Sequence, residues 1–271
     1  MEKLLSTKTD LKIVPKSYIL PPDSRLGSIK LTNHGVPEKL LQDVLDVTEE
    51  FLKLSAEDKA IAFSEDPKQS CGLYTSIDYM KEQVVGSYSV EVRKLSLCLL
   101  DLIGKGLGLV PGYFQDKTEL TEVQIMSTAH CPPCPDPSLT LGLPKHSDVN
   151  LVTLVLQEVE DLQVLKDGQW HTIKPLPNAF VVNIGYTLQN ISNGKLRSVE
   201  HRVVTNQKVA RTSVASFILP SNSCQIEPAK VLIKDTSPPL YNGFTFKDFM
   251  GTYIEDIHQK KPPLERYKLQ V

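Results

Sequence analysis

Three residues just before a strongly apolar stretch give the first chemical signal in the sequence. His146 and Asp148 flank Ser147, and residues 149–156 follow as a predicted β-strand. In an extended chain the side chains at positions i and i+2 point to the same side. If the extended conformation already begins at His146, an imidazole and a carboxylate stand together as two neighbouring metal ligands. A His-x-Asp triplet is common by chance, so its significance depends on a third ligand.

His201 is the strongest candidate for that third ligand because of the residues that follow it. It lies in a predicted strand at residues 199–204, and Arg211 and Ser213 share one face of the next predicted strand. A guanidinium beside a hydroxyl can hold a carboxylate through charge-assisted hydrogen bonds. Among the other histidines, we expect surface or packing roles for His34, His171 and His258. The role of His130 is left open.

These five residues together predict one kind of metal chemistry. Two His and one carboxylate on one side of a metal ion leave the opposite side open, as in non-haem Fe(II) oxygenases. Open positions are needed for a co-substrate and for dioxygen. Arg211 and Ser213 suit a dicarboxylate that chelates the iron at one end and is anchored at the other, and 2-oxoglutarate fits this description. The competing interpretation is that the five residues coincide by accident and that Arg211 forms a surface ion pair.

The pair Cys131 and Cys134 invites two other interpretations, a redox motif and a zinc site. A thioredoxin-type motif needs a helix directly after it, whereas Pro135 and Pro137 prevent a continuing helix. A structural zinc site would need two more ligands at matching spacing, and the sequence has no second cysteine pair. Five cysteines is a low and odd number for this chain, so we expect reduced thiols.

Composition argues against several classes of function. The 271 residues are 41% hydrophobic and 23% charged, as in a globular protein, and 30 Lys and Arg against 32 Asp and Glu give a net charge of -2. A chain without a basic field is a poor candidate for nucleic-acid binding. No apolar run approaches the roughly 18 residues that span a bilayer, and the N-terminus lacks a secretory signal. We therefore expect a cytoplasmic protein with no nucleic-acid or membrane partner.

The first part of the chain is predicted to be mainly helical. A polar leader at residues 1–26 comes first. The spacing of apolar residues then predicts a short strand at 29–32 and two amphipathic helices, at 38–54 and 88–103. Pro37 opens the first helix, Ser55 resembles the N-cap of a further short helix, and three glycines, at 104, 106 and 108, mark the end of the second. Residues 62–86 show no assignable pattern.

From residue 122 onward the period becomes strand-like. Short runs rich in branched residues predict strands at 123–126, 151–156, 162–165, 180–184, 199–204 and 212–219. Asp167-Gly168 is a two-residue hairpin signal, and Asn193-Gly194 marks a further turn. Strands at this spacing, without long helices between them, favour an antiparallel sandwich or jelly roll over a parallel sheet. The fold class is therefore α+β with a mainly β core.

The sequence resembles the plant 2-oxoglutarate and Fe(II)-dependent dioxygenases over residues 124–220. The stretches that carry the resemblance are CPPCPDPSLTLGLPKHSD, DGQWHTIKPLPNAFVVNIG, LQNISNGKLRSVEHRVV and RTSVASFILP. Outside the core, LTNHGVPEKLLQDV and SCQIEPAKVLI are most similar to the branch that contains hyoscyamine 6-beta-hydroxylase. The resemblance implies a double-stranded β-helix flanked by helices. It implies that His146, Asp148 and His201 bind iron and that Arg211 and Ser213 anchor 2-oxoglutarate. It also implies ascorbate as a reductant and a small-molecule substrate.

The sequence departs from the family in ways that bear on activity. Where the family usually has Asn-Tyr-Tyr, with the second Tyr helping to hold 2-oxoglutarate, this chain has Ala129-His130-Cys131. His130 or Cys131 could substitute in part, although a thiol is a weak donor. Two segments in the first half are also shorter than in relatives. The expected activity is hydroxylation of an alkaloid, a flavonoid or another plant phenolic, and the alternative is a shortened member without enzymatic activity.

We divide the chain accordingly into three regions. Residues 1–121 form a shortened N-terminal helical region, 122–222 the jelly-roll core, and 223–271 a C-terminal strand and lid segment. A cupin of other chemistry is the third possibility, and it is disfavoured because nothing in the cupin pattern requires Arg211 and Ser213.

Overall fold

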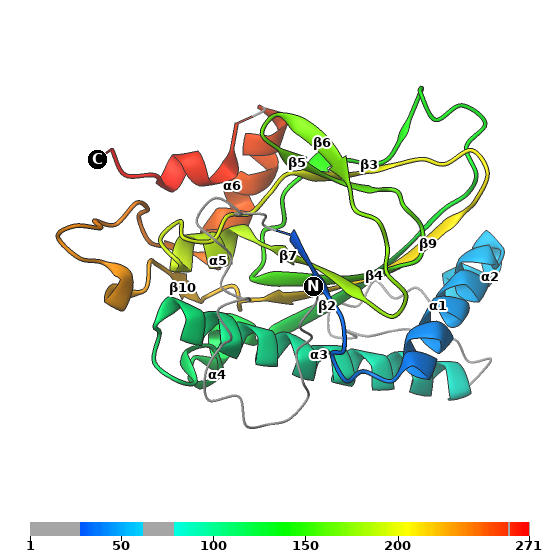
Figure 1. The fold of residues 1–271 in the computed structure, drawn as a ribbon, viewed down its shortest axis with the longest axis horizontal. Helices are drawn as coiled ribbons and strands as arrows, with labels where there is room; N and C mark the ends of the chain where they lie inside the picture. The colour runs from blue at the N-terminus through cyan, green and yellow to red at the C-terminus, as the bar shows by residue number, and fades with distance from the viewer. Residues whose placement is uncertain (1–27, 62–78, 260, 271) are drawn as a thin grey trace, which may run out of the picture.

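The computed structural model describes residues 28–61, 79–259 and 261–270, and two antiparallel sheets form its centre (Figure 1). The strand order of the larger sheet is β1 (Ser28–Leu31), β7 (Phe180–Ile184), β4 (Val152–Gln157), β9 (Arg211–Leu219) and β2 (Val123–Cys131). The order of the smaller sheet is β3 (Leu141–His146), β8 (His201–Val204), β5 (Leu162–Lys166) and β6 (Gln169–Thr172). From β3 to β9 the chain passes repeatedly from one sheet to the other. This topology is the double-stranded β-helix, or jelly roll, that the sequence predicted.

Helices cover the outer face of the larger sheet. The long helix α3 (Tyr79–Leu107) packs against β4 and β9, and α1 (Glu38–Lys53) contacts α3, β9 and β2 (Figure 1). The remaining helices are shorter: α2 (Ala56–Ile61), α4 (Tyr113–Asp116), α5 (Tyr186–Ile191) and α6 (Phe246–His258). The described chain also contains three short 3-10 helices, at Thr118–Thr121, Lys230–Leu232 and Pro263–Tyr267. Strands β10 (Gln225–Ile226) and β11 (Phe244–Thr245) form a separate two-stranded pair. Among the described residues, no helix is both long and apolar enough to cross a membrane.

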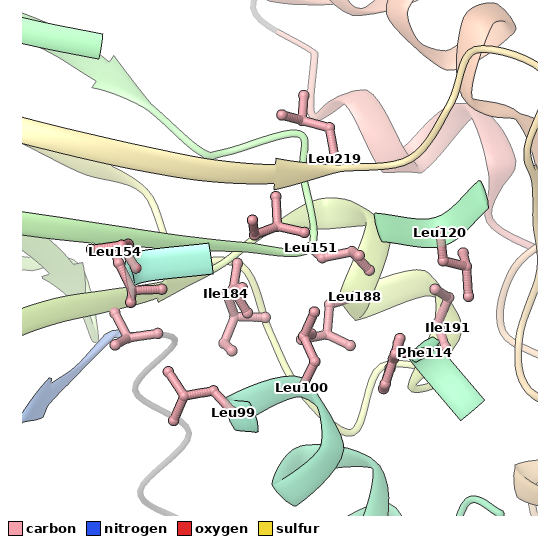
Figure 2. Close-up of a cluster of buried hydrophobic side chains, with 14 of the residues drawn as sticks. Leu99, Leu100, Phe114, Leu120, Leu151, Leu154, Ile184, Leu188, Ile191 and Leu219 are labelled. Atoms are coloured by element: carbon pink, nitrogen blue, oxygen red, sulfur yellow. The ribbon is translucent and has the colours of Figure 1, made fainter. Parts of the chain in front are cut away.

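The main apolar core lies between the larger sheet and these helices. Figure 2 shows Leu99 and Leu100 of α3 facing Leu151, Leu154 and Ile184 from the sheet side. All five are buried, and Leu100, Leu151 and Leu154 are fully shielded from solvent. Burial of this much aliphatic surface is the main stabilising contribution to the fold.

A second, smaller apolar cluster lies between the two sheets. Val155 of β4 and Val181 of β7 meet Leu162 and Val203 of the smaller sheet there, whereas Leu154 belongs to the helix-covered core. Because side chains alternate along a strand, β4 presents its even-numbered residues to the helices and its odd-numbered residues to the interior of the jelly roll. That interior is where the predicted site residues lie.

Most predicted elements of the first half are confirmed, and one helix boundary is wrong. Helix α1 follows Pro37, and Ser55 Oγ accepts a hydrogen bond from the Asp58 N–H at 3.1 Å as the predicted N-cap of α2. Helix α3 begins at Tyr79 rather than at residue 88, and it continues through Gly104 and Gly106 to Leu107. Its end coincides only with the last of the three glycines, Gly108, which has a φ of +76°.

The longer α3 has a physical reason. Of the three glycines, only Gly108 has the left-handed φ that ends a helix, whereas Gly104 and Gly106 are not in that conformation and lie within the helix. The predicted leader at residues 1–26 and most of the unassigned stretch 62–86 lie outside the described residues, whereas residues 79–86 are helical.

In the second half the predicted strands and the hairpin are confirmed, although β2 continues to Cys131, beyond its predicted end at residue 126. Strand β3, helices α5 and α6 and the short pair β10 and β11 were not predicted. Asp167 and Gly168 have φ values of +51° and +76° and join β5 to β6 as a tight hairpin. Strand β3 was missed because it is an exposed edge strand that contains Gly142 and Pro144 and has irregular register.

Helix α6 lies in the region that was expected to form a C-terminal strand and lid segment, and no helix was predicted there. Phe246, Phe249 and Tyr253 recur at helical spacing, and Phe246 and Phe249 are buried. Thr245 caps the helix by accepting a hydrogen bond from the Asp248 N–H at 3.1 Å. The aromatic spacing and the cap were both readable in the sequence, but they are interspersed with charged residues.

Candidate metal and co-substrate site

His146, Asp148 and His201 come together at one end of the jelly roll. His146 is the last residue of β3, His201 is the first residue of β8, and the two are paired directly across the strands. One possible ligand atom from each of the three residues lies within 4.8 Å of the other two. The Nε2 atoms of His146 and His201 are 3.8 Å and 3.6 Å from Asp148 Oδ1. Three donors therefore face a common point, which suits a metal ion.

Asp148 lies close to His146, as the sequence predicted, with Oδ1 3.8 Å from Nε2. It lies in the loop between β3 and β4, outside the strands of both sheets. The cross-strand pairing of His146 with His201 brings the two imidazoles together, and the loop places Asp148 beside both rings.

Both histidine side chains are oriented by a further hydrogen bond. The Nδ1 atoms of His146 and His201 lie 2.9 Å and 3.2 Å from the carbonyl oxygens of Pro144 and Val199. A ring whose Nδ1–H donates in this way leaves the Nε2 lone pair free for a metal. Burial lowers the pKa of His201, against the opposing effect of Asp148, and so favours the neutral imidazole that a metal requires.

The ligand loop is held by helices α5 and α6 through three successive carbonyl groups. The carbonyl of Ser147 accepts from Tyr253 Oη at 3.0 Å, and that of Asp148 accepts from the Tyr186 N–H at 2.8 Å. The carbonyl of Val149 accepts from Thr187 Oγ1 at 2.7 Å. Burial raises the pKa of Tyr253 to about 12, which keeps its hydroxyl protonated as a donor.

Arg211 and Ser213 lie at the start of β9, on the face that points into the jelly roll. Arg211 donates from Nη1 to Ser213 Oγ at 2.6 Å and from Nη2 to Gln157 Oε1 at 2.8 Å. Arg211 is only 4% exposed, and its Nε–H has no hydrogen-bond partner. These two hydrogen-bond partners are uncharged. Burial lowers the pKa of the guanidinium, and the charges of Cys131 and the Asp161 carboxylate oppose that effect. A buried guanidinium with neutral hydrogen-bond partners and a spare donor can bind an anionic ligand.

The structure also shows which neighbour replaces the family's tyrosine. Cys131 of β2 is paired with Arg211, and Ala129 is paired with Ser213. Residues directly opposite each other in antiparallel strands project to the same face, so Cys131 lies beside the guanidinium. His130 points to the other face, where its Nδ1 lies 2.9 Å from Thr212 Oγ1. Of the two substitutes considered from the sequence, only the thiol is placed next to the anchor.

None of the other described histidines and cysteines belongs to the three-residue group of possible ligands. His34 packs edge-on against Phe180, with ring centroids 4.8 Å apart. His171 is on β6 and His258 ends α6. Within the described part of the chain, Cys131 and Cys134 are free thiols and the three-residue group at His146 is the one cluster suited to a metal.

Sequence reasoning missed three residues that support the site: Thr153, Gln157 and Tyr253. Thr153 Oγ1 donates to Asp148 Oδ2 at 2.7 Å. Thr153 and Gln157 are polar residues in the otherwise apolar strand β4, and each is at most 3% exposed. Polar residues at odd positions of a buried strand were the available signal, whereas the role of Tyr253 depends on the tertiary position of α6.

Comparisons with known proteins agree with this geometry. Residues 122–220 match the family model of the 2OG-Fe(II) oxygenase superfamily, and residues 24–92 match the N-terminal model of non-haem dioxygenases in morphine synthesis. The chain is 38% identical to hyoscyamine 6-dioxygenase of Hyoscyamus niger, over 90% of this chain and 83% of that protein. It is 39% identical to flavanone 3-dioxygenase 2 of Oryza sativa subsp. japonica, over 82% and 75%.

Solved structures show the same architecture. The crystal structure of JOX2 in complex with 2OG, Fe and JA superimposes with a TM-score of 0.75 at 28% identity, covering 90% of this chain and 82% of that one. The structure of the dioxygenase for auxin oxidation in rice gives a TM-score of 0.77 at 21% identity, covering 91% and 92%. The second likeness concerns the fold alone.

Proposed function

The chain belongs to the 2OG-Fe(II) oxygenase superfamily, and from this membership we propose a role for each of the five predicted site residues. The protein is a dioxygenase that uses Fe(II), 2-oxoglutarate and dioxygen, with ascorbate as a typical reductant. In our proposal His146, Asp148 and His201 hold the iron, and Arg211 and Ser213 bind the far carboxylate of 2-oxoglutarate. The observation that carries the proposal is the convergence of the three ligand atoms within 4.8 Å, on the rim of the same interior that contains Arg211.

The donor set fits Fe(II), and the buried guanidinium fits a dicarboxylate. Bound iron supplies the activation of dioxygen that couples decarboxylation of 2-oxoglutarate, to succinate and carbon dioxide, with oxidation of a substrate C–H bond. The protein's own contribution is positioning. The two rings present Nε2, Thr153 keeps Asp148 Oδ1 free by bonding Oδ2, and the apolar cluster between the sheets limits access of water.

We further propose that the reaction is hydroxylation of a small plant specialised metabolite, such as an alkaloid, a flavonoid or another phenolic. The support is that relatives covering most of this chain include hyoscyamine 6-dioxygenase and flavanone 3-dioxygenase 2. Cytoplasmic localisation stays a prediction from the sequence.

The test is succinate formation by the purified protein with Fe(II), ascorbate and 2-oxoglutarate, first alone and then with a panel of alkaloids and flavonoids. We expect slow uncoupled turnover without substrate and stimulation by one class of compound. Asp148→Ala is the inactive control. Absence of both succinate and 2-oxoglutarate binding in the wild type would favour the alternative, a shortened member without activity. Full activity of Asp148→Ala would overturn the ligand assignment.

A further inference from the structure

Gln157 occupies an interior position beside the proposed co-substrate anchor. It is the last residue of β4, is 3% exposed, and is paired across the strands with Ser213 of β9. Ser213 is in turn paired with Ala129 of β2. Because directly paired residues share a face, these three side chains form a row across three neighbouring strands. The row lies next to Arg211 and Cys131, which pair with each other in the same way.

The contact with Arg211 fixes the orientation of the Gln157 amide. An amide oxygen accepts and an amide nitrogen donates, and the atom that faces Arg211 Nη2 at 2.8 Å is Oε1. The amide nitrogen Nε2 is therefore directed elsewhere, and it is buried without a hydrogen-bond partner. Arg211 Nε is a second buried donor without a partner. Unpaired buried donors are uncommon and costly in folded proteins, so two of them in one place indicate an absent acceptor.

The charge and number of donors indicate what that acceptor is. Ser213 Oγ accepts from Arg211, which leaves its own hydroxyl hydrogen available to donate. Arg211, Ser213 and Gln157 thus present one charged and two neutral donors. A carboxylate offers about four acceptor positions on two oxygens. The arrangement fits one carboxylate group at the place where Cys131 supplies only a thiol.

We propose that Gln157 is a co-substrate-binding residue, whose Nε2–H donates to the far carboxylate of 2-oxoglutarate and takes over part of the missing phenol's role. This inference rests on the proposed function. It goes beyond it by assigning a third binding group to the anchor. It also requires that the effect of Gln157 depends on the far carboxylate and not on the metal-chelating end of the ligand.

The test compares two ligands on the Zn(II)-loaded protein, since Zn(II) is redox-inert and accepts the same His and carboxylate donors. Calorimetry measures binding of 2-oxoglutarate and of 2-oxopentanoate, which has the same chain length but no far carboxylate. We expect Gln157→Met to weaken 2-oxoglutarate binding about tenfold, as for loss of one hydrogen bond to a charged group, and to leave 2-oxopentanoate binding unchanged. Gln157→Glu, which keeps the shape of the side chain, should weaken 2-oxoglutarate binding further.

Gln163→Met is the matched control. Gln163 of β5 also accepts from an arginine, Arg202 Nε, at 2.8 Å, but its Nε2 already donates to Thr172 Oγ1 at 3.2 Å. The Gln163→Met variant should bind 2-oxoglutarate and 2-oxopentanoate with wild-type affinity. A direct readout is the nuclear magnetic resonance signal of the Gln157 side-chain amide, identified by its loss in Gln157→Met, which should shift with 2-oxoglutarate and stay in place with 2-oxopentanoate.

The outcomes separate this inference from the proposed function. Wild-type-like 2-oxoglutarate binding by Gln157→Met, or equal losses for both ligands, would overturn the role of Gln157 alone. A Gln157 amide signal that does not shift when 2-oxoglutarate binds would also overturn the role of Gln157. A wild-type protein that binds metal but no 2-oxoglutarate would overturn both.

Discussion

The two oxygens of Asp148 have separate tasks. Oδ1 lies between the Nε2 atoms of His146 and His201, at 3.8 Å and 3.6 Å, whereas Oδ2 accepts from Thr153 Oγ1 at 2.7 Å. Thr153 is itself held by the Asn150 amide, whose Nδ2 lies 3.1 Å from Oγ1. The residue types at positions 146, 148 and 201 could be recognised from the sequence. The polar side chain of Thr153 in an apolar strand was visible in the sequence. Its role was not, because the contact with Asp148 depends on how the loop folds back on β4.

We predict that Thr153→Val weakens metal binding. Valine has nearly the same shape but cannot donate to Oδ2, so the carboxylate loses the bond that sets its orientation. Loss of such supporting contacts typically costs tenfold to a hundredfold in metal affinity. Titration of the apoprotein with Co(II) or Fe(II) measures the effect. Thr172→Val, on the outer face of β6, serves as control, and equal affinities of the two variants would contradict the prediction.

At the scale of elements, α5 and α6 act as a clamp on the loop that carries Asp148. Tyr186 and Thr187 at the start of α5 and Tyr253 of α6 bind three successive carbonyls of residues 147–149. Helix α6, which was not predicted from the sequence, thus supports the loop that carries Asp148, one of the proposed iron ligands. The sequence contains the aromatic spacing of α6, but the distance of 106 residues between Tyr253 and Ser147 is bridged only by the tertiary fold.

We predict that Tyr253→Phe loosens this clamp without disturbing the aromatic cluster around Phe249. The Ser147 carbonyl loses its donor, and we expect a severalfold loss of metal affinity together with about 1 kcal/mol of unfolding free energy. Tyr267→Phe is a matched control, since its hydroxyl lies 3.3 Å from Thr252 Oγ1 and not near the loop. The two variants should lose similar stability, measured by denaturant titration, but only Tyr253→Phe should change metal binding. A shared loss of metal affinity would assign the effect to general packing.

His34 connects the turn after β1 to the segment before β7. Its Nδ1 accepts from the Val36 N–H at 3.2 Å, and its Nε2 lies 2.9 Å from the Asn178 carbonyl. The neutral ring is needed for this pair of contacts, because a protonated Nδ1 cannot accept. Burial lowers the pKa of His34 below its ordinary value of 6.5.

The predicted consequence is a loss of stability in acid. A lowered folded-state pKa means that the unfolded chain binds the proton first, so the contribution of His34 is complete above pH 6.5 and is lost as the pH falls through the folded-state pKa. We expect the melting temperature of the wild type to exceed that of His34→Gln at pH 8, and the difference to shrink toward pH 5. If the difference in melting temperature grew toward pH 5, the predicted direction of the pH dependence would be wrong. Other groups also titrate in this range, but they are common to both proteins.

For the molecule as a whole, the sequence predicted the jelly-roll fold better than the boundaries of its elements. The strands β4 and β7 were recognisable because they are short, branched and almost wholly buried. Strand β3, which carries His146, is exposed at a sheet edge and contains Gly142 and Pro144, so local pattern gave no strand signal. Gln157 could not be assigned a role because its partner lies across the sheet. The division at residues 121 and 222 stays a prediction.

The two faces of β4 lead to a final prediction that separates folding from function. Leu154 is fully buried in the helix-covered core, whereas Val155 faces the interior. Val155 lies between Thr153, which contacts the proposed ligand Asp148, and Gln157, which contacts Arg211. Leu154→Ala should cost about 2–5 kcal/mol of unfolding free energy through lost burial and a cavity. Its affinity for 2-oxoglutarate should be unchanged, because the site lies on the other face of the strand.

Val155→Leu should show the opposite pattern. One extra methylene group in the space between the metal ligands and the anchor should raise the KM for 2-oxoglutarate, with a smaller effect on stability, about 1–3 kcal/mol for overpacking. Denaturant titration and succinate assays on both variants measure the two effects. If Leu154→Ala changed the KM as much as Val155→Leu, the prediction would be wrong. The helix-covered core and the interior of the jelly roll would then both determine 2-oxoglutarate binding.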